Sequence, residues 1–99
     1  MGVGLALSEE IHYDPSGGIV NGSSLDYRIP TIVDIPAQLT SLFQENRDGP
    51  GPFGSKGMGE GGILAVGPAI CSAIFELTGV YPRDFPITPE KLWTLLKGS

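Results

Sequence analysis

The stretch "GPAICSAIFELTG", Gly67–Gly79, carries the clearest helical signal in the chain. Pro68 suits the first turn of a helix, where its missing N–H group removes no hydrogen bond. Gly79 is the residue type that most often stands just beyond a helix. Between them, apolar side chains recur at the spacing i, i+3, i+4 and i+7, at Ile70, Ala73, Ile74 and Leu77. The pattern predicts a core helix whose apolar face another element must cover.

Two further helices are predicted, one near each end of the chain. "ITPEKLWTLLKG", Ile87–Gly98, offers Thr88 as N-cap and Pro89 as the first helical residue. Its last turn contains Lys97, and its apolar face consists of Leu92, Leu95 and Leu96. "GVGLALSEEI", Gly2–Ile11, is expected to be a short helix because Val3, Leu7 and Ile11 recur at helical spacing.

The segments between these helices carry β signals. "HYDPSGGIV", His12–Val20, places turn residues between two β-prone runs and predicts a hairpin. In residues 26–43, Pro30 and Pro36 force extended geometry on the residues before them. An alternation of Leu39, Ser41 and Phe43 then predicts a strand, followed by a loop from Asn46 to Gly62. Hairpin, strand and three helices together predict an α+β fold.

Length and composition favour part of a larger protein. Ninety-nine residues form at most one domain, and a chain of this size buries only about 60–70% of its unfolded surface. The chain has 15 glycines and nine prolines, and 17% of its residues are charged. So many residues that resist regular structure leave little for a free-standing core. We therefore expect residues 1–99 to form an incomplete domain.

Net charge, cysteine content and the length of apolar runs argue against nucleic acid and membrane as partners and favour one cellular compartment. A net charge of −5 with scattered basic residues argues against nucleic-acid binding. The single cysteine, Cys71, cannot form an internal disulfide, and no secretory signal opens the chain, so a cytoplasmic location is expected. The longest apolar run, Gly61–Phe75, is shorter than the ~20 residues of a membrane helix and contains Gly67-Pro68. No membrane association is predicted.

The glycine-rich loop "GPFGSKGMGEGG", Gly51–Gly62, matches nucleotide-binding motifs only in part. In the phosphate-binding loop a lysine and a hydroxyl follow the last glycine directly, whereas Lys56 comes one place late and Gly57 follows it. Residues 57–62 meet the dinucleotide pattern G-x-G-x-x-G literally. No strand precedes them, and Glu60 would repel a phosphate, so neither motif predicts a nucleotide site.

Isolated residues give weaker signals. One histidine and one cysteine cannot supply a zinc centre, so no metal ligands are predicted. Cys71 is expected to be a buried small hydrophobic residue, and His12 to be structural or to face solvent. Arg28 is expected to form an ion pair rather than to contact a ligand. Glu60 stands where the small-residue loop meets the apolar segment. It is either a general base held beside a bound group or a solvated glutamate at a helix N-terminus.

Four motifs in register resemble one protein family. "GSKGMGE", Gly54–Glu60, is accompanied by "GVGLALSEEIHYD", "NGSSLDYRIPTIVDIP" and "FPITPEKLWTLL", in the family's order and spacing. Together they resemble the C-terminal end of the molybdenum-binding subunit of the xanthine dehydrogenase and aldehyde oxidase family. The resemblance covers essentially all 99 residues, and it accounts for the fragment-like composition because family subunits run to several hundred residues.

The resemblance implies roles for particular residues. Glu60 matches the family's general base, which takes a proton from a hydroxyl bound to molybdenum before its oxygen attacks an electron-poor carbon. The loop that lines the cofactor, as molybdopterin or its cytosine dinucleotide form, matches Gly54, Ser55, Lys56, Gly57, Met58 and Gly59. Absent side chains there let backbone donors approach the cofactor. The ammonium of Lys56 is left open between the cofactor and an acidic neighbour.

The resemblance also implies partners and leaves one alternative. Family members commonly have Gln-Gly where Met1-Gly2 stands, so that glutamine contact is either absent or lies on another chain. The chain would oxidise an N-heterocycle or an aldehyde only with the remainder of its subunit and with iron–sulfur domains or subunits, with or without FAD. The isolated chain is expected to be inactive. The alternative is a non-catalytic interaction module whose apolar helix faces pack on a partner or on a second copy.

Overall fold

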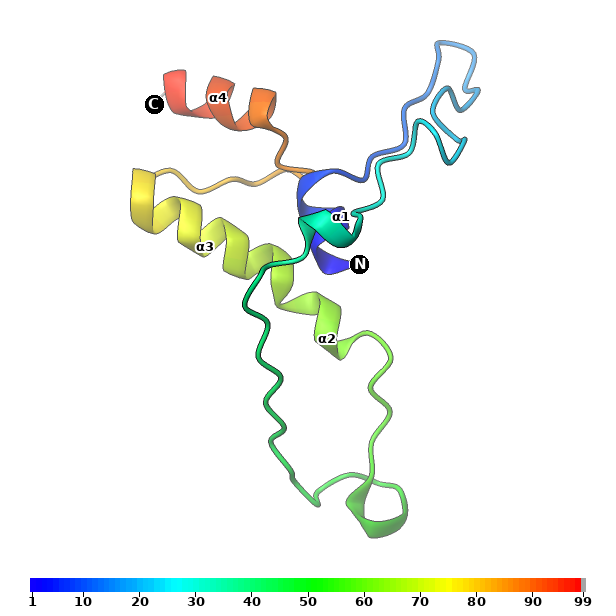
Figure 1. The fold of residues 1–99 in the computed structure, drawn as a ribbon, viewed down its shortest axis with the longest axis vertical. Coiled ribbons are helices and arrows are strands. Elements are labelled where there is room, and N and C mark those ends of the chain that lie inside the picture. The colour runs from blue at the N-terminus through cyan, green and yellow to red at the C-terminus, as the bar shows by residue number, and fades with distance from the viewer. Residues whose placement is uncertain (99) are drawn as a thin grey trace.

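The computed structural model describes residues 1–98 as helices joined by long irregular segments (Figure 1). In chain order the elements are α1 (Gly2–Leu7), the 3-10 turns η1 (Ile32–Asp34) and η2 (Pro52–Gly54), α2 (Gly61–Leu64), α3 (Val66–Thr78) and α4 (Pro89–Lys97). Residues 1–98 contain no strand beyond one isolated bridge. The β part of the predicted α+β fold is therefore wrong for the described chain.

The predicted hairpin forms its turn but not its strands. One carboxylate oxygen of Asp14 accepts the backbone N–H groups of Ser16 at 2.8 Å and Gly18 at 2.9 Å. The hydroxyl of Ser16 also donates to it, and these bonds hold the pKa of Asp14 below its ordinary value. Beyond the turn, pairing stops at the single bridge between Tyr13 and Ile19. A two-stranded ribbon without a third strand or a covering helix has little to extend it.

The predicted strand at Leu39, Ser41 and Phe43 is absent as well. These residues lie in an irregular segment in which Leu39 and Phe43 are exposed. Strand geometry persists where a neighbouring strand pairs with the backbone N–H and C=O groups. No such neighbour lies within residues 1–98, so local alternation alone does not produce a strand.

Helix α1 ends at Leu7, four residues earlier than predicted. Ser8 donates its hydroxyl to the backbone carbonyl of Arg28 at 2.9 Å. Glu9 then accepts the hydroxyl of Tyr27 at 2.9 Å, and this bond to the carboxylate raises the pKa of Tyr27. The backbone N–H groups of Ser8 and Glu9 both donate to the carbonyl of Gly4, at 2.9 and 2.8 Å, so the regular helical ladder ends there. The side-chain contacts with residues 27 and 28 then hold the chain that leaves the helix.

The central helix confirms the strongest sequence prediction. It begins at Val66, two residues before Pro68, and follows α2 almost without interruption. It ends before Gly79, whose φ of 74° lies in the left-handed region that favours glycine. Cys71 is buried at 3% exposure, as predicted. The helix is nevertheless less covered than a core helix should be, because Leu77 is 86% exposed.

Helix α4 begins and ends as predicted. Thr88 caps it by accepting the backbone N–H of Lys91 at 3.3 Å, Pro89 is its first residue, and Lys97 is its last. Two contacts join this end of the chain to the beginning. The backbone N–H of Ile87 donates to the carbonyl of Ala6 at 2.7 Å. The ammonium of Lys91 lies 3.0 Å from the carboxylate of Glu10.

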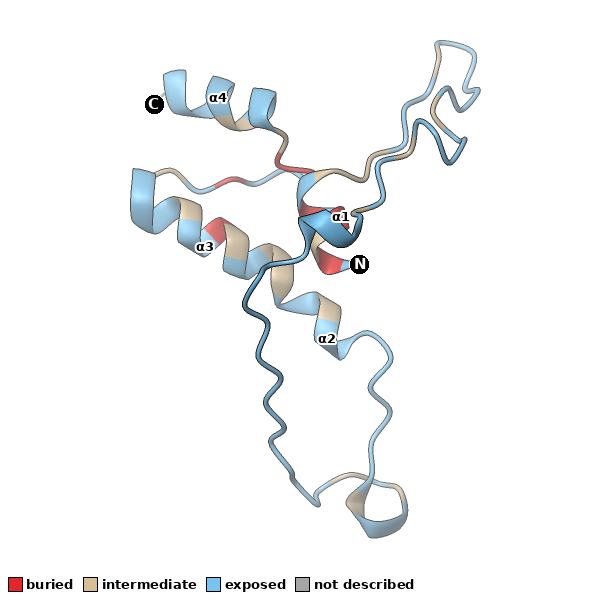
Figure 2. Cartoon of the chain, viewed as in Figure 1, coloured by how far each residue is buried: buried red, intermediate tan, exposed pale blue. Residues whose placement is uncertain are grey.

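The packing leaves most apolar side chains in contact with solvent (Figure 2). Among the described residues, only Ala6, Cys71 and Ile87 form a buried hydrophobic core. The accessible surface is 8440 Å², whereas a compact protein of this mass exposes about 5,400 Å². The radius of gyration is 17.5 Å, against about 13 Å for a compact domain of this length. The helices therefore present large apolar faces that residues 1–98 do not cover.

One helical stretch, Gly61–Thr78, is long and apolar enough to cross a membrane by length and composition. The prediction that no segment crosses a membrane used the shorter apolar run Gly61–Phe75. The helical stretch is three residues longer, so length alone does not exclude a membrane helix. A core helix of a soluble protein passes the same test. The stretch is also divided at Ala65 into α2 and α3. Length and composition therefore do not assign this segment to a membrane.

Candidate functional site

The glycine-rich segment leaves the helices and returns to α2 in one long excursion (Figure 1). Its far end is a turn closed by backbone hydrogen bonds. The N–H groups of Gly49 and Gly51 each donate at 3.1 Å, to the carbonyls of Gly54 and Ser55 respectively. Inside this frame η2 reverses the chain, with Phe53 and Gly54 both at positive φ. Residues 49–55 are thus a self-contained turn.

The glycines of this turn are required by the turn itself. Gly54 has a φ of 78°, and a Cβ atom there would collide with the backbone of Arg47. A Cβ on Gly49 would collide with the carbonyl oxygens of Gly54 and Ser55. The absence of a side chain at Gly54 therefore has a local cause, independent of any bound group.

Lys56 closes the side of the turn with an ion pair. Its ammonium lies 2.8 Å from the carboxylate of Asp48, and both side chains are substantially exposed. Of the two interpretations left open for this ammonium, the acidic neighbour is the one observed within the described chain.

Residues 56–60 differ from the turn in two ways. None of their backbone N–H groups donates to an acceptor in residues 1–98. Gly57 and Gly59 have no atom within 4 Å of a Cβ built on them, and neither lies at the positive φ that would demand glycine. Met58 is 79% exposed. Neither backbone conformation nor contacts within the described chain explain why these two positions are glycine.

Glu60 is the last of these five residues and immediately precedes α2. It is the N-cap residue of that helix, and its carbonyl accepts the N–H of Ile63 at 2.9 Å. Its side chain is exposed and forms no hydrogen bond or ion pair with the described residues. The carboxylate is thus free to interact with a group outside residues 1–98, while its backbone is tied to a helix.

The donor set of residues 56–59 fits an oxygen-rich cofactor. Consecutive N–H groups can approach the oxygens of a pterin, and the two glycines add no atom that would obstruct them. The same residues do not fit a metal directly. Within residues 1–98, no group of three or more histidine, cysteine, aspartate or glutamate side chains could hold a metal ion. Any metal here would be carried by the cofactor.

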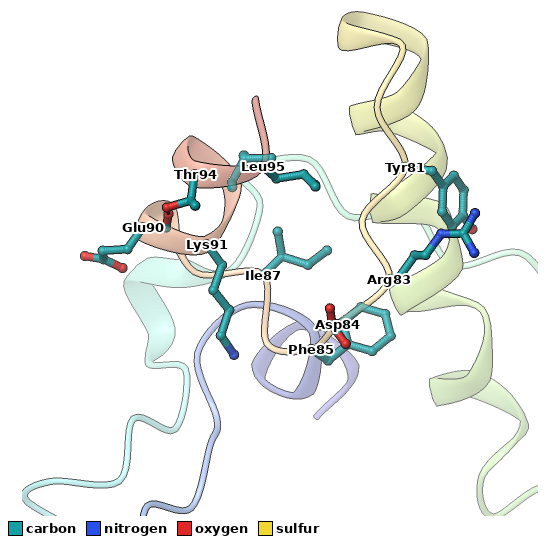
Figure 3. Close-up of a pocket in the computed structure, with 10 residues that line it drawn as sticks. Tyr81, Arg83, Asp84, Phe85, Ile87, Glu90, Lys91, Thr94 and Leu95 are labelled. Carbon is teal, nitrogen blue, oxygen red and sulfur yellow. The ribbon is translucent and has the colours of Figure 1, made fainter. Parts of the chain in front are cut away.

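A separate groove lies between α4 and the connector from α3 to α4 (Figure 3). Its volume is about 840 Å³, and none of residues 54–60 lines it. Tyr81 and Arg83 lie on the connector, Thr94 and Leu95 come from α4, and Ile87 lies between the two elements. The sequence analysis missed this groove, although the amphipathic pattern of α4 marks one of its walls.

A family model described as a molybdopterin cofactor-binding domain matches residues 1–36. Among curated relatives, the putative xanthine dehydrogenase molybdenum-binding subunit XdhA of Escherichia coli K12 is 42% identical over 94 residues. The aldehyde oxidoreductase molybdenum-binding subunit PaoC of the same organism is 39% identical over 93 residues. These matches cover 94% and 93% of this chain but only 12% and 13% of those proteins. The chain thus spans about an eighth of the length of these relatives.

A solved structure gives the same result for the fold. Quinoline 2-oxidoreductase from Pseudomonas putida 86 contains a similar segment with a TM-score of 0.72 and 31% sequence identity. The match covers 97% of this chain and 12% of that one. The two curated relatives are molybdenum-binding subunits by name. The chain is a short segment of a molybdopterin-binding subunit of the xanthine dehydrogenase family.

Proposed function

We propose that this chain is the base-bearing, C-terminal part of a molybdopterin-binding domain in a molybdenum hydroxylase. The observation that carries the proposal is the position of Glu60. Its unpartnered carboxylate follows directly on four residues, 56–59, whose backbone N–H groups have no acceptor within residues 1–98. The family membership of the segment supplies the class of cofactor that those donors would meet.

The cofactor-binding part of the proposal concerns Gly54, Ser55, Lys56, Gly57, Met58 and Gly59. The closed turn at residues 49–55 holds the start of this run, and the N–H groups that follow it would bind the molybdopterin oxygens. When bound, the molybdenum cofactor supplies a nucleophilic oxygen derived from water and accepts two electrons from the substrate. Iron–sulfur partners, with or without FAD, would remove those electrons, and the cofactor itself would be molybdopterin or its cytosine dinucleotide form.

Glu60 would act as the general base. A carboxylate can accept a proton when it lies within hydrogen-bond reach of the reacting group, about 2.6–3.2 Å between heavy atoms. The first turn of α2 holds its backbone through the Ile63 N–H bond, so only the side-chain torsions remain to be set. The exposed carboxylate has no competing cation within residues 1–98 that would neutralise it.

The proposed substrate is an N-heterocycle or an aldehyde. The relatives are named for xanthine and for aldehydes, and the solved structure is named for quinoline. All these compounds present an electron-poor carbon to an oxygen nucleophile. The three best-formed pockets of residues 1–98 are not lined by the proposed site residues, and we propose that the choice between these substrates depends on the remainder of the subunit.

The test is Glu60→Gln in the molybdenum-loaded enzyme that carries this segment. Glutamine keeps the size and the hydrogen-bonding capacity of the side chain but cannot accept the proton. We expect kcat to fall by about 10²–10⁴-fold with the molybdenum content unchanged. Glu45→Gln, an exposed carboxylate in the same excursion, is the matched control and should keep wild-type turnover. Wild-type turnover of Glu60→Gln would refute the assignment.

A second candidate function is supported by the exposed apolar surface. Leu77 is 86% and Trp93 60% exposed, on α3 and α4 respectively. Such faces are expected of a segment that packs on a partner, whether or not it takes part in catalysis. In a pure interaction module, the chain purified with its natural neighbours would contain no molybdenum, and Glu60→Gln would leave the assembly intact and change no activity.

A further inference from the structure

Helix α1 is built from residues that disfavour a short helix. It has six residues, two of which are glycine, and its buried face consists of Gly2, Gly4 and Ala6. Glycine gives the backbone the greatest freedom to lose on folding. A six-residue helix with two glycines therefore persists because its packing needs small residues, and the contacts of Gly2 show where.

Gly2 lies against the beginning of α3. A Cβ atom built on Gly2 would be 2.7 Å from both Cβ and Cγ2 of Val66. Real Cβ contacts do not reach such distances, and the Val66 Cβ atom is fixed to the helix backbone, so it cannot rotate away. Only glycine allows α1 and α3 to approach as closely as they do. A side chain at this position would push Val66, and the helix that carries it, outward.

Val66 is connected to the candidate base by a short, largely helical path. It is six residues beyond Glu60, and α2 occupies the four residues between Glu60 and Ala65. Helix α1 contacts both α2 and α3. The carbonyl of Glu60 is bonded to the N–H of Ile63 within the first turn of α2. A displacement at Val66 is therefore transmitted along about one and a half helical turns to the backbone of Glu60.

We infer that Gly2 is a positioning residue for Glu60: its close contact with Val66 sets where α2 begins and hence where the carboxylate lies. This inference deepens the proposed function and rests on it, because Glu60 matters only if it is the general base. The contact itself is independent of that role, since it is defined by helix packing alone.

The experiment uses Gly2→Ala in the molybdenum-loaded enzyme that carries this segment. We expect kcat to fall by about 10–100-fold, because displacements near 1 Å have effects of this size on catalysis. KM and molybdenum content should stay near wild type. Adding Val66→Ala to Gly2→Ala makes room for the new methyl group and should restore most of the lost kcat. Leu5→Ala, on the exposed side of α1, is the matched control and should change none of these values.

A structural measurement complements the kinetics. In a crystal structure of the Gly2→Ala enzyme, the backbone of Glu60 should move by about 0.5 Å or more, and the double variant should return it. If Gly2→Ala does not fold, Val66→Ile with Gly2 intact enlarges the same contact from the other side and should give the same loss of kcat.

The outcomes separate the two proposals. Wild-type turnover of Gly2→Ala, while Glu60→Gln is inactive, would overturn the positioning role and leave the proposed function standing. A loss that Val66→Ala does not rescue, or an unmoved Glu60 in the variant structure, would overturn it as well. Full activity of Glu60→Gln would instead remove the proposed function, and the positioning role with it.

Discussion

Residues 49–55 and residues 56–60 are both rich in glycine, yet the two regions use it differently. In the first region, glycine allows a positive φ at Gly54 and close backbone packing at Gly49. In the second region, Gly57 and Gly59 meet no neighbour and adopt no unusual φ. The contrast shows that one half of the loop is explained by its own folding. The other half has no such explanation within residues 1–98, and we propose that a bound group outside those residues accounts for it.

The largest expected effect comes from placing valine in the first region. Gly54→Val combines a β-branched residue at positive φ with a collision against the Arg47 backbone. We expect the free energy of unfolding to fall by about 3 kcal/mol or more, as measured by urea unfolding of the cofactor-free protein. Gly57→Val is the matched control, and it should lower the free energy of unfolding by no more than about 0.5 kcal/mol. Equal losses of unfolding free energy for the two variants would contradict the claim that only the first region needs its glycines for folding.

A smaller effect is expected where the two regions meet. The ion pair between Lys56 and Asp48 is exposed on both sides, so it should contribute about 0.2–1 kcal/mol at low salt. A double-mutant cycle with Lys56→Ala and Asp48→Ala measures the coupling directly. The coupling should vanish at about 1 M salt, where screening acts over about 3 Å. A coupling that survives high salt would show that Lys56 interacts with more than its neighbour.

The smallest effect concerns η1, a turn in which a side-chain cap adds to the backbone bond from the Asp34 N–H to the Thr31 carbonyl. The carboxylate of Asp34 accepts the N–H of Thr31 at 2.7 Å, and this bond, with the Thr31 hydroxyl, holds its pKa below the ordinary 3.8. A lowered pKa means that this carboxylate stabilises the turn above pH 3.8, and that the contribution is lost as the pH falls through the folded-state value.

In an acid titration followed by NMR, the Thr31 amide resonance should therefore shift as the pH falls below 3.8. The amide of Gly49, which donates to the backbone carbonyl of Gly54, should not shift over the same range. A Thr31 amide that remains unchanged down to pH values well below that point would contradict the capping role of Asp34.

Sequence reasoning succeeded where local chemistry decides structure. Thr88 and Pro89 set the beginning of α4, and Gly79 set the end of α3, because capping and left-handed φ depend on a few adjacent residues. It failed where structure needs a distant partner. The strand expected at residues 39–43 has no neighbour to pair with among the described residues, and the residues after Leu7, expected to be helical, instead contact residues 27 and 28.

For the candidate site, too, part of the information came from the sequence and part from the structure. Its residues were selected by the resemblance of "GSKGMGE" to a family motif, and their roles remain predictions. The structure added the local reason for Gly54, the ion pair of Lys56 and the unpaired backbone of residues 56–60. The contact between Gly2 and Val66 could not have been predicted, because nothing in the spacing of residues 64 positions apart in sequence reveals a close approach.

By itself, the sequence determined the family, the caps of the two long helices and the choice of Glu60 as candidate base. These properties depend on residue identity and on neighbours within one helical turn. Only the tertiary structure decided which glycines the fold itself requires and which it leaves bare. That distinction depends on the distance from each backbone position to atoms remote in the sequence, and those distances exist only once α1, α3 and the loop are packed.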